Sequence, residues 1–274
     1  MMPSIPVIKI EGRTLPEAWE RAVVDTWEQG IAMRTEYDKP DDPESRDCTM
    51  IMIIDEPFLE PRIHRAFPGS LEDLEVYRQE VVSGIHDHWI NPEAGKWTYT
   101  YHQRMFSYEA EDGVIDQIGC IIDKLAAVPH TRRAQAITWD PAKDPETDDP
   151  PCLQRIWCRL VRMDGERFML TMNTHWRSRD AYKASFMNMY ALTDLQRVIA
   201  GEISKKIGKT VEVGRYVDIS DSFHIYGSYA EEFQNFLNLI KRRTFEERTW
   251  ATKFAQPFFD DAKRRLLEEA STEG

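Results

Sequence analysis

The chain has 274 residues, of which 42% are hydrophobic and 11% aromatic, enough to build a sizeable core in a globular protein. Its formal net charge of -12, with basic residues scattered among acids, argues against binding of a nucleic-acid polymer. The N-terminus lacks the pattern of a signal peptide, and nowhere do about 18 apolar residues run together, so we expect a cytoplasmic protein without a membrane partner. Four cysteines without CxxC spacing predict reduced thiols and no cysteine zinc site.

Hydrophobic periodicity predicts the elements of the first half of the chain. Glycines end two of the predicted helices, and acids in the first turn of the second helix suit its N-terminus. A charged, proline-bearing loop that carries Arg34 and Arg46 precedes a buried strand. In chain order we predict a helix at 15–30, a surface loop around 36–47, a strand at 49–54, a helix from Ser70 to Gly84, a helix at 115–126 and a strand within 131–140.

A β-hairpin is the strongest local prediction in the second half. Two alternating segments, 153–163 and 167–176, flank "DGE", and Asp-Gly tolerates the positive φ angles of a tight turn. Cys152 should open the first strand and Arg177 should close the second, so antiparallel pairing brings them together. The remaining elements are a helix at about 187–207, a strand pair around 210–226, a helix at 229–243 and a C-terminal helix. Without an internal repeat or linker, we expect one α+β domain over residues 1–274.

Cys152 follows the acidic, proline-rich stretch "DPETDDPP". A free cysteine is most often a small core hydrophobe, and a charged run at a strand end is most often solvated surface. The predicted neighbourhood of Cys152 and the run Arg177 to Asp180 favours a second interpretation. A guanidinium lowers the pKa of a nearby thiol, and Arg with Ser suits a monophosphate. A second basic pair, Arg132 and Arg133, is either solvated or part of such a site.

Several motifs together resemble the thymidylate synthase family over roughly residues 85–230. They are "PPC" at 150–152, "RSxD" at 177–180 with Asn188 eight residues after Asp180, "DSFHIY" at 221–226 and "TRRAQAITWD" at 131–140. That family consists of homodimers whose two-layer α/β subunits place a curved mixed sheet at the interface and helices on its other face. Its members transfer a one-carbon unit from 5,10-methylenetetrahydrofolate to C5 of a pyrimidine nucleoside 5′-monophosphate. The resemblance implies this fold, this co-substrate and active sites shared between subunits.

Carried onto this chain, the resemblance implies a set of catalytic residues. Cys152 matches the nucleophile that adds to C6, and this addition turns the unreactive C5 into a nucleophile. Tyr99 matches a tyrosine implicated in removal of the C5 proton. Glu60 is the candidate general base, and Glu56 competes with it.

The resemblance also implies binding residues. Phosphate contacts come from arginines of both subunits, which suits an acidic protein because only a converging cluster overcomes the background field. The implied contacts are Arg177, Ser178 and Arg46 (with Arg34 as a rival) on the phosphate, Arg132 and Arg133 from the partner subunit on the same phosphate, Asn188 on the base, His224 and Tyr226 on the sugar 3′-hydroxyl, and Asp180 and Trp89 on the folate.

Departures from the family pattern bear on the product. The family's W-D-x-W pattern is "HDHW" here, so His86 replaces a tryptophan that shields the reactive exocyclic carbon, and water can then compete with hydride. Leu153 follows the nucleophile where the family usually has histidine, which weakens the case for uracil. Asn188 can pair with either base, since an amide can rotate. The tail also lacks the family's long closing segment. His86 and His88 could instead bind a metal, but no third ligand stands at a fixed spacing, so we expect none.

We therefore predict a homodimeric hydroxymethylase that acts on C5 of a pyrimidine nucleoside monophosphate, CMP or dCMP. The alternative is a thymidylate synthase that methylates dUMP. A second alternative is a nucleotide-binding protein that keeps the fold without catalysis.

Overall fold

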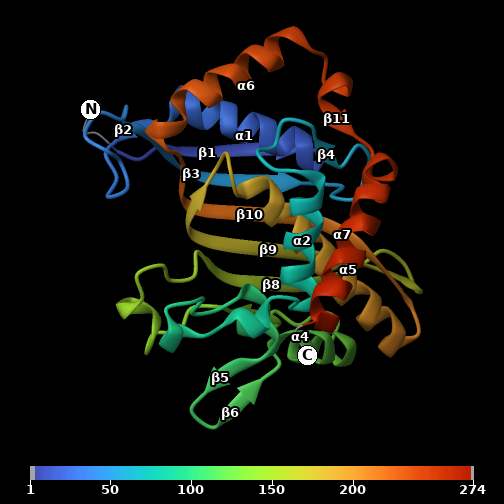
Figure 1. The fold of residues 1–274 in the computed structure, drawn as a ribbon. Coiled ribbons are helices and arrows are strands. Elements are labelled where there is room, and N and C mark those ends of the chain that lie inside the picture. The colour runs from blue at the N-terminus through green and yellow to red at the C-terminus, as the bar shows by residue number, and fades with distance from the viewer. Residues whose placement is uncertain (1–3, 273–274) are drawn as a thin grey trace.

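The computed structural model of the chain describes residues 4–272, and the side chains of residues 4–268. Within these residues a seven-stranded mixed sheet forms the centre (Figure 1). Its strands are β1 (Val7–Gly12), β2 (Ile31–Met33), β3 (Ser45–Ile54), β7 (Gln135–Ile137), β8 (Leu153–Arg162), β9 (Arg167–Asp180) and β10 (Thr210–Ile225). The order across the sheet is β1-β3-β10-β9-β8-β7, and β2 pairs with β3. The pairs β1-β3 and β10-β9 are parallel, and the others are antiparallel.

Helices surround this sheet, and two short two-stranded sheets lie beside it. The α-helices are α1 (Leu15–Gln29), α2 (Leu71–Ser83), α3 (Tyr101–Phe106), α4 (Gln117–Ala127), α5 (Ser185–Ile207), α6 (Ala230–Arg242) and α7 (Thr252–Thr272). The short strands are β4 (Ile63–His64) with β11 (Thr249–Trp250), and β5 (Tyr108–Ala110) with β6 (Gly113–Ile115). Short 3-10 helices are η1 (Asp87–Trp89), η2 (Pro92–Ala94), η3 (Asp144–Glu146), η4 (Gly227–Tyr229) and η5 (Glu246–Arg248).

The two faces of the sheet differ in burial. On β3, Met50 and Met52 are fully buried, whereas the alternate residues Ile51 and Ile53 are half-buried. Helix α1 packs against β1 and β3, and α5 packs against β9 and β10. Because successive side chains of a strand point to opposite faces, helices seal one face and leave the other partly open.

Local sequence signals set the ends of α2 as predicted. The Ser70 hydroxyl accepts a hydrogen bond from the Asp73 amide at 3.0 Å, and the Asp73 carboxylate accepts one from the Ser70 amide at 2.9 Å. This reciprocal pair is a capping box. At the other end Gly84 adopts φ of +65°, a left-handed conformation that glycine reaches without strain.

Most of the predicted elements are confirmed. The expected α+β architecture with a mixed sheet is present, as are the predicted helices, which appear as α1, α2, α4, α5, α6 and α7. The predicted hairpin is β8-β9. Strand β9 extends to Asp180, three residues beyond the predicted end at Arg177. The extension pairs with β10, where His224 lies opposite Asp180.

Two predictions about strands are wrong, and a third strand is shorter than its predicted segment. The segment around 210–226 is the single strand β10, which stays paired along its length through two register shifts, instead of a strand pair. Strand β3 begins at Ser45, so Arg46 lies on a strand instead of a loop, paired with Ala32 and Ile225. The strand predicted within 131–140 is confirmed as β7, but it covers only Gln135–Ile137, which leaves Arg132 and Arg133 in a loop.

The four cysteines are free thiols. Among the residues that the structure describes, no helix is long and apolar enough to cross a membrane.

Candidate functional site

The β8-β9 hairpin brings Cys152 and Arg177 together, as predicted. The Arg177 amide donates to the Cys152 carbonyl at 2.9 Å, next to the paired residues Leu153 and Trp176. The Arg177 guanidinium also donates to two carbonyls of the proline pair, at 3.1 Å from Nε to Pro151 and 2.6 Å from Nη2 to Pro150. Cys152, only partly buried, is thus fixed at the strand entrance beside a guanidinium.

The expectation of a lowered thiol pKa at Cys152 is wrong for the chain as described. Burial raises the pKa of the thiol and Asp149 raises it further, while Arg177 and Arg179 lower it. The two guanidiniums offset only part of the cost of placing a thiolate away from water. The sulfur is therefore mainly a protonated thiol at neutral pH.

Two tyrosines adjoin this sulfur. The Tyr101 hydroxyl accepts a hydrogen bond from the Leu153 amide at 3.3 Å, and its ring packs edge-on against Trp176 at 5.8 Å between centroids. The Tyr99 ring lies 5.7 Å from that of Tyr101. Burial, with the charge of Cys152 as a further cause, raises the pKa of both phenols. Tyr99 was predicted and Tyr101 was missed, although "YTY" offers both.

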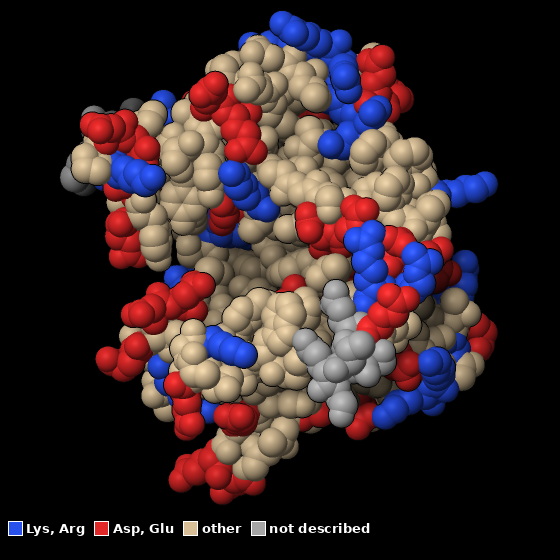
Figure 2. All heavy atoms as spheres, in the orientation of Figure 1, with Lys and Arg blue, Asp and Glu red and all other residues tan. Residues whose placement is uncertain are grey.

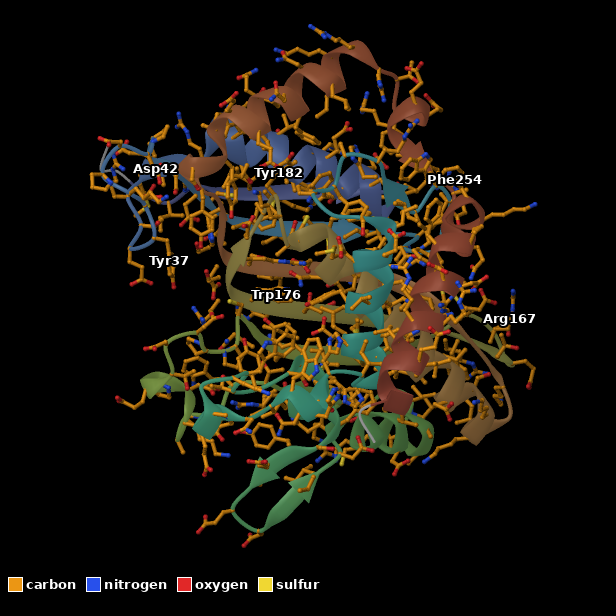
Figure 3. All side chains as sticks on the ribbon, viewed as in Figure 1. Tyr37, Asp42, Arg167, Trp176, Tyr182 and Phe254 are labelled. Atoms are coloured by element: carbon orange, nitrogen blue, oxygen red, sulfur yellow. The ribbon has the colours of Figure 1, made fainter. Side chains whose placement is uncertain are left out.

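A cavity of about 700 Å³ lies beside these tyrosines. Figure 2 shows that this side of the molecule is hollowed in the middle, and Trp176 lies at the same level in Figure 3. The walls of the cavity come from α2, from the aromatic stretch after η1 and from the acidic loop before Cys152. The lining residues are Tyr77, Glu80, Val81, Pro92, Gly95, Lys96, Trp97, Thr98, Tyr99, Thr100, Tyr101, Glu146, Thr147, Asp148 and Asp149.

Glu80 and His86 form a polar pair at this cavity. Burial, followed by the charge of Asp87, raises the pKa of the Glu80 carboxyl to about 7. His86 Nδ1 lies 3.6 Å from Glu80 Oε1, and its ring stacks on Trp89 at 3.6 Å and 10°. Trp89 in turn meets Trp97 of the cavity wall edge-on at 5.2 Å. A carboxyl that exchanges its proton near neutral pH thus stands beside an imidazole. Glu80 was not predicted from the sequence, since neither its residue type nor its spacing marks it as a residue of a cavity.

The two glutamates predicted from the sequence lie elsewhere. Glu60 is exposed, and its Oε2 accepts hydrogen bonds from the amides of Arg62 and Thr252, both at 3.0 Å, at the start of α7. Glu56 pairs with Arg13 at 2.5 Å. Neither carboxylate belongs to the described lining of the cavity. Glu60 as the base stays a prediction without support from these contacts.

His224 has a defined tautomer. The Ser222 hydroxyl donates its one hydrogen to Asp47 Oδ2 at 2.8 Å, so its contact of 3.1 Å with His224 Nδ1 requires that nitrogen to donate. The other ring nitrogen, Nε2, then carries the lone pair. Nε2 is buried and has no hydrogen-bond partner among the described residues. Burial lowers the pKa of His224 to about 4, so the ring is neutral and Nε2 accepts. The Tyr226 ring lies 4.7 Å from it.

Asp180 and Ser178 lie at the end of β9. The Asp180 Oδ1 accepts hydrogen bonds from the amides of Tyr182 at 3.0 Å and Lys183 at 2.8 Å, and burial raises the pKa of the carboxyl. Its other oxygen, Oδ2, takes no part in these two bonds. Ser178 is half-buried opposite Ser222 of β10.

The remaining predicted arginines differ in their availability. Arg34 donates to the carbonyls of Lys39 at 3.3 Å and Asp42 at 2.7 Å and so closes its own loop. Half-buried Arg46 donates to the Gly30 carbonyl at 3.3 Å. Arg132 and Arg133 are exposed, and neither guanidinium has a hydrogen bond or ion pair with any described residue.

Asn188, on the first turn of α5, is held on both sides of its amide. Its Oδ1 accepts from Arg179 Nε at 3.3 Å, and its Nδ2 donates to the Tyr77 hydroxyl at 2.6 Å. Tyr77 was not predicted from the sequence, and Arg179 entered the prediction only as a member of the charged run 177–180. No group of three or more His, Cys, Asp or Glu side chains in the described part of the chain is arranged to hold a metal ion.

Comparison with known proteins agrees with this arrangement. The family model described as "Thymidylate synthase" matches residues 71–261. A protein named "Putative thymidylate synthase" from Methanosarcina acetivorans is 29% identical over 217 residues, covering 79% of this chain and 88% of that protein. Its namesake from Methanosarcina mazei is 30% identical over 219 residues with the same coverage. The one from Methanocaldococcus jannaschii is 32% identical over 170 residues, 60% of this chain and 68% of that protein.

Members of the matched family are one-carbon transferases that act on pyrimidine nucleotides with methylenetetrahydrofolate as co-substrate. Because the match covers more than half of the sequence, this chain belongs to the thymidylate synthase family.

Proposed function

We propose that the protein is a C5-hydroxymethylase of CMP or dCMP. The observation that carries this proposal is the pairing of His86 with Glu80 beside the cavity. A tryptophan at the position of His86 would keep water from the reacting carbon. An imidazole and a carboxyl with a pKa of about 7 can instead bind a water molecule and take its proton.

The proposed nucleophile is Cys152, whose sulfur forms a bond to C6 of the pyrimidine. Burial keeps the pKa of this thiol raised, so its proton has to leave as the nucleotide binds. The charges of Arg177 and Arg179 favour the thiolate. Tyr99 and Tyr101 adjoin the sulfur and stay neutral, so their hydroxyls can donate hydrogen bonds.

We propose Glu80 as the general base in preference to Glu60. Glu80 lines the cavity, and its pKa of about 7 lets it accept a proton at neutral pH and release it again. Two protons have to move, one from C5 and one from the water that adds. The carboxyl of Glu80 and the imidazole of His86, 3.6 Å apart, suit these transfers.

The residues present fit a nucleotide. His224 Nε2 is a buried acceptor without a partner among the described residues, and a sugar hydroxyl would supply the missing donor. We propose that Tyr226 joins it at the sugar, and that Arg177, Ser178 and Arg46 hold the phosphate. Arg34 remains the rival of Arg46 at the phosphate, since a single nitrogen, Nη1, makes both of its bonds to carbonyls of its own loop.

The residues also fit a folate. The walls of the cavity carry Trp97, Tyr99 and Tyr101, and aromatic rings of this kind pack against a flat bicyclic ring. When bound, methylenetetrahydrofolate supplies the one-carbon unit. We propose that Asp180 and Trp89 take part in holding it.

We further propose a homodimer of single-domain subunits, each spanning residues 1–274. The half-buried face of the sheet supports this assembly, because Ile51, Ile53 and Trp157 on it remain partly open to solvent. A groove of about 600 Å³ that includes Trp157 lies mainly over β8 and β9. Arg132 and Arg133 would reach the phosphate of the partner subunit.

Mixed subunits test the shared site. A mixture of Cys152→Ala and Arg133→Ala chains should regain part of the activity that each homodimer lacks, since one site of a heterodimer would be intact. No recovery after subunit exchange, verified by sedimentation of differently tagged chains, would reject a shared site.

Product mass after incubation with methylenetetrahydrofolate and CMP, dCMP, UMP or dUMP tests the reaction. We expect a hydroxymethyl product from a cytidylate. The names of the relatives favour a second candidate, methylation of dUMP. That reaction oxidises the folate to dihydrofolate and raises the near-ultraviolet absorbance, whereas hydroxymethylation does not. A methyl product from dUMP would overturn our proposal.

A further inference from the structure

A chain of buried polar groups runs from the sheet toward the cavity, and it begins at Asp218. The fully buried Asp218 carboxylate accepts a hydrogen bond from Arg179 Nη1. Its Oδ2 also accepts from the Tyr216 hydroxyl at 2.8 Å, the Thr174 hydroxyl at 3.0 Å and Trp176 Nε1 at 3.2 Å. A carboxylate with this many donors has a fixed position and fixes the guanidinium that it binds.

Arg179 is held equally firmly. Its side chain is 1% exposed, its Cζ lies 4.2 Å from the centre of the Trp176 ring, and its Nη2 donates to the Ser185 carbonyl at 2.9 Å. The third nitrogen of the guanidinium, Nε, lies 3.3 Å from the side-chain amide of Asn188. A guanidinium has no acceptor, so the amide atom beside it has to be the oxygen. The amide of Asn188 therefore cannot rotate freely, contrary to the expectation from its residue type.

The chain of hydrogen bonds continues from Asn188 to Tyr77. With Oδ1 facing Arg179, Nδ2 faces the Tyr77 hydroxyl and donates to it at 2.6 Å. The hydroxyl oxygen accepts this bond, so its own hydrogen is free to point elsewhere. Tyr77 lines the cavity, and burial raises its pKa well above the usual value, which keeps the hydrogen in place. Asn188 keeps a second hydrogen on Nδ2. The free groups at this end of the chain are thus donors.

We infer that Arg179 is a positioning residue that makes Asn188 and Tyr77 present donors to the pyrimidine, and that this arrangement selects cytosine over uracil. This inference depends on the proposed function, because it concerns the base at the same site. N3 of cytosine is an acceptor, whereas N3 of uracil carries a hydrogen. A donor of the protein placed at N3 would pair with the first and face a hydrogen of the second, and an unpaired buried donor is costly. The inference requires the donors to face N3 and not the 4-position, which is an amino donor in cytosine and a carbonyl acceptor in uracil.

Binding of CMP and UMP, which share sugar and phosphate, isolates the base. With the full chain and calorimetry, we expect CMP to bind more tightly by roughly tenfold, as one well-formed base contact provides. Arg179→Gln, whose amide can donate or accept, should shrink this ratio at least about threefold. Arg179→Lys, which only donates, should keep most of it. A purely structural role would weaken both nucleotides together and leave the ratio unchanged.

Tyr77→Phe keeps the experiment decisive if Arg179→Gln fails to fold, because it leaves the Asp218 pair intact and should also shrink the ratio. Tyr108→Phe, at a hydroxyl that donates to the Trp139 carbonyl, is the matched control and should leave the ratio unchanged. Equal binding of CMP and UMP by the natural chain, tighter binding of UMP, or a ratio that Tyr77→Phe does not alter would overturn the inference alone. Absence of binding to both nucleotides would instead overturn the proposed function.

Discussion

Two buried histidines, His64 and His224, have opposite surroundings. His64 is completely paired, since its Nε2 lies 2.9 Å from Glu20 Oε2 and its Nδ1 accepts from the Ala66 amide at 3.2 Å. The Glu20 carboxylate also accepts two hydrogen bonds from Arg248, at 2.6 Å from Nε and 2.7 Å from Nη2. This cluster joins α1, β4 and η5 and has no open position at the imidazole.

His224 is paired on one side only. Ser222 and Asp47 fix its Nδ1, and its buried Nε2 has no partner within the described chain. Burial is the largest cause lowering the pKa of both imidazoles. An unpaired buried acceptor costs free energy in a folded protein. A completed cluster therefore stabilises the fold, whereas an incomplete one is suited to a ligand.

The largest expected effect concerns the proposed active site, to which both His224 and Cys152 are assigned. Cys152→Ala removes the proposed nucleophile, so we expect release of tritium from C5-labelled nucleotide to fall by roughly 10³-fold or more. Cys120→Ala, at an exposed cysteine, is the matched control and should keep its activity. Exchange that persists in Cys152→Ala would show that this region does no covalent chemistry.

Disruption of the completed cluster of Glu20, His64 and Arg248 should lower the stability of the fold. Glu20→Gln leaves the buried guanidinium of Arg248 without its opposite charge, so we expect the free energy of unfolding to fall by about 3–5 kcal/mol in urea denaturation. Glu202→Gln, in an exposed pair with Lys205, should change it by less than about 1 kcal/mol. Equal effects of the two substitutions would contradict the distinction drawn between the clusters.

The pH dependence of stability tests Glu80. Its folded pKa of about 7 exceeds the usual 4.5, so its contribution to stability is complete below pH 4.5 and is lost as the pH rises through 7. Glu80→Gln should remove this loss and be more stable than the natural chain above neutral pH, by about 1–3 kcal/mol. Activity should change in the opposite sense, since the base works as a carboxylate and the rate rises through pH 7. Identical unfolding curves of both proteins across this range would reject the raised pKa.

His224→Ala should act on binding more than on folding. Loss of one hydrogen bond to the sugar, about 0.5–1.5 kcal/mol, corresponds to a two- to tenfold rise in the dissociation constant of CMP. The natural chain should bind the 3′-deoxy analogue of CMP as weakly as His224→Ala binds CMP. The variant should bind CMP and the analogue with equal affinity. A variant that still prefers CMP over the analogue would place the sugar elsewhere.

Arg133→Ala should have the smallest effect on stability. Its guanidinium is exposed and makes no hydrogen bond or ion pair to a described residue, so the free energy of unfolding should change by less than about 0.5 kcal/mol. A larger loss that does not depend on protein concentration would point to a structural role within the subunit. Urea unfolding of Arg133→Ala and of the natural chain under the same conditions measures this difference in free energy.

Local signals made much of the fold predictable. Ser70 and Gly84 bound α2, and Asp164 and Gly165 mark the turn between β8 and β9. The strand errors have a common cause. Arg46 belongs to β3 only because β2 and β10 pair with it, and such partners are far away in the sequence. Propensity cannot reveal them.

Part of the candidate site was predictable for the same reason. The hairpin joins Cys152 to Arg177 through neighbouring strands, so the sequence predicted their contact. The sequence pointed to Glu60, with Glu56 as rival, and not to Glu80, because residue type and spacing do not reveal which carboxyl is buried beside a cavity. The pKa of Cys152 was misjudged because desolvation depends on packing, which a nearby arginine does not indicate.

The amino-acid sequence by itself determined the helix ends, the hairpin and the family, since these depend on short-range caps, turns and motif order. Only the tertiary structure decided the tautomer of His224, the orientation of the Asn188 amide and the proton affinity of Glu80. Each of these depends on donors, acceptors and low-polarity surroundings that α2, β3, β9 and β10 bring together from distant parts of the chain. Hydrogen-bond direction and desolvation are properties of that assembled environment and not of a residue type.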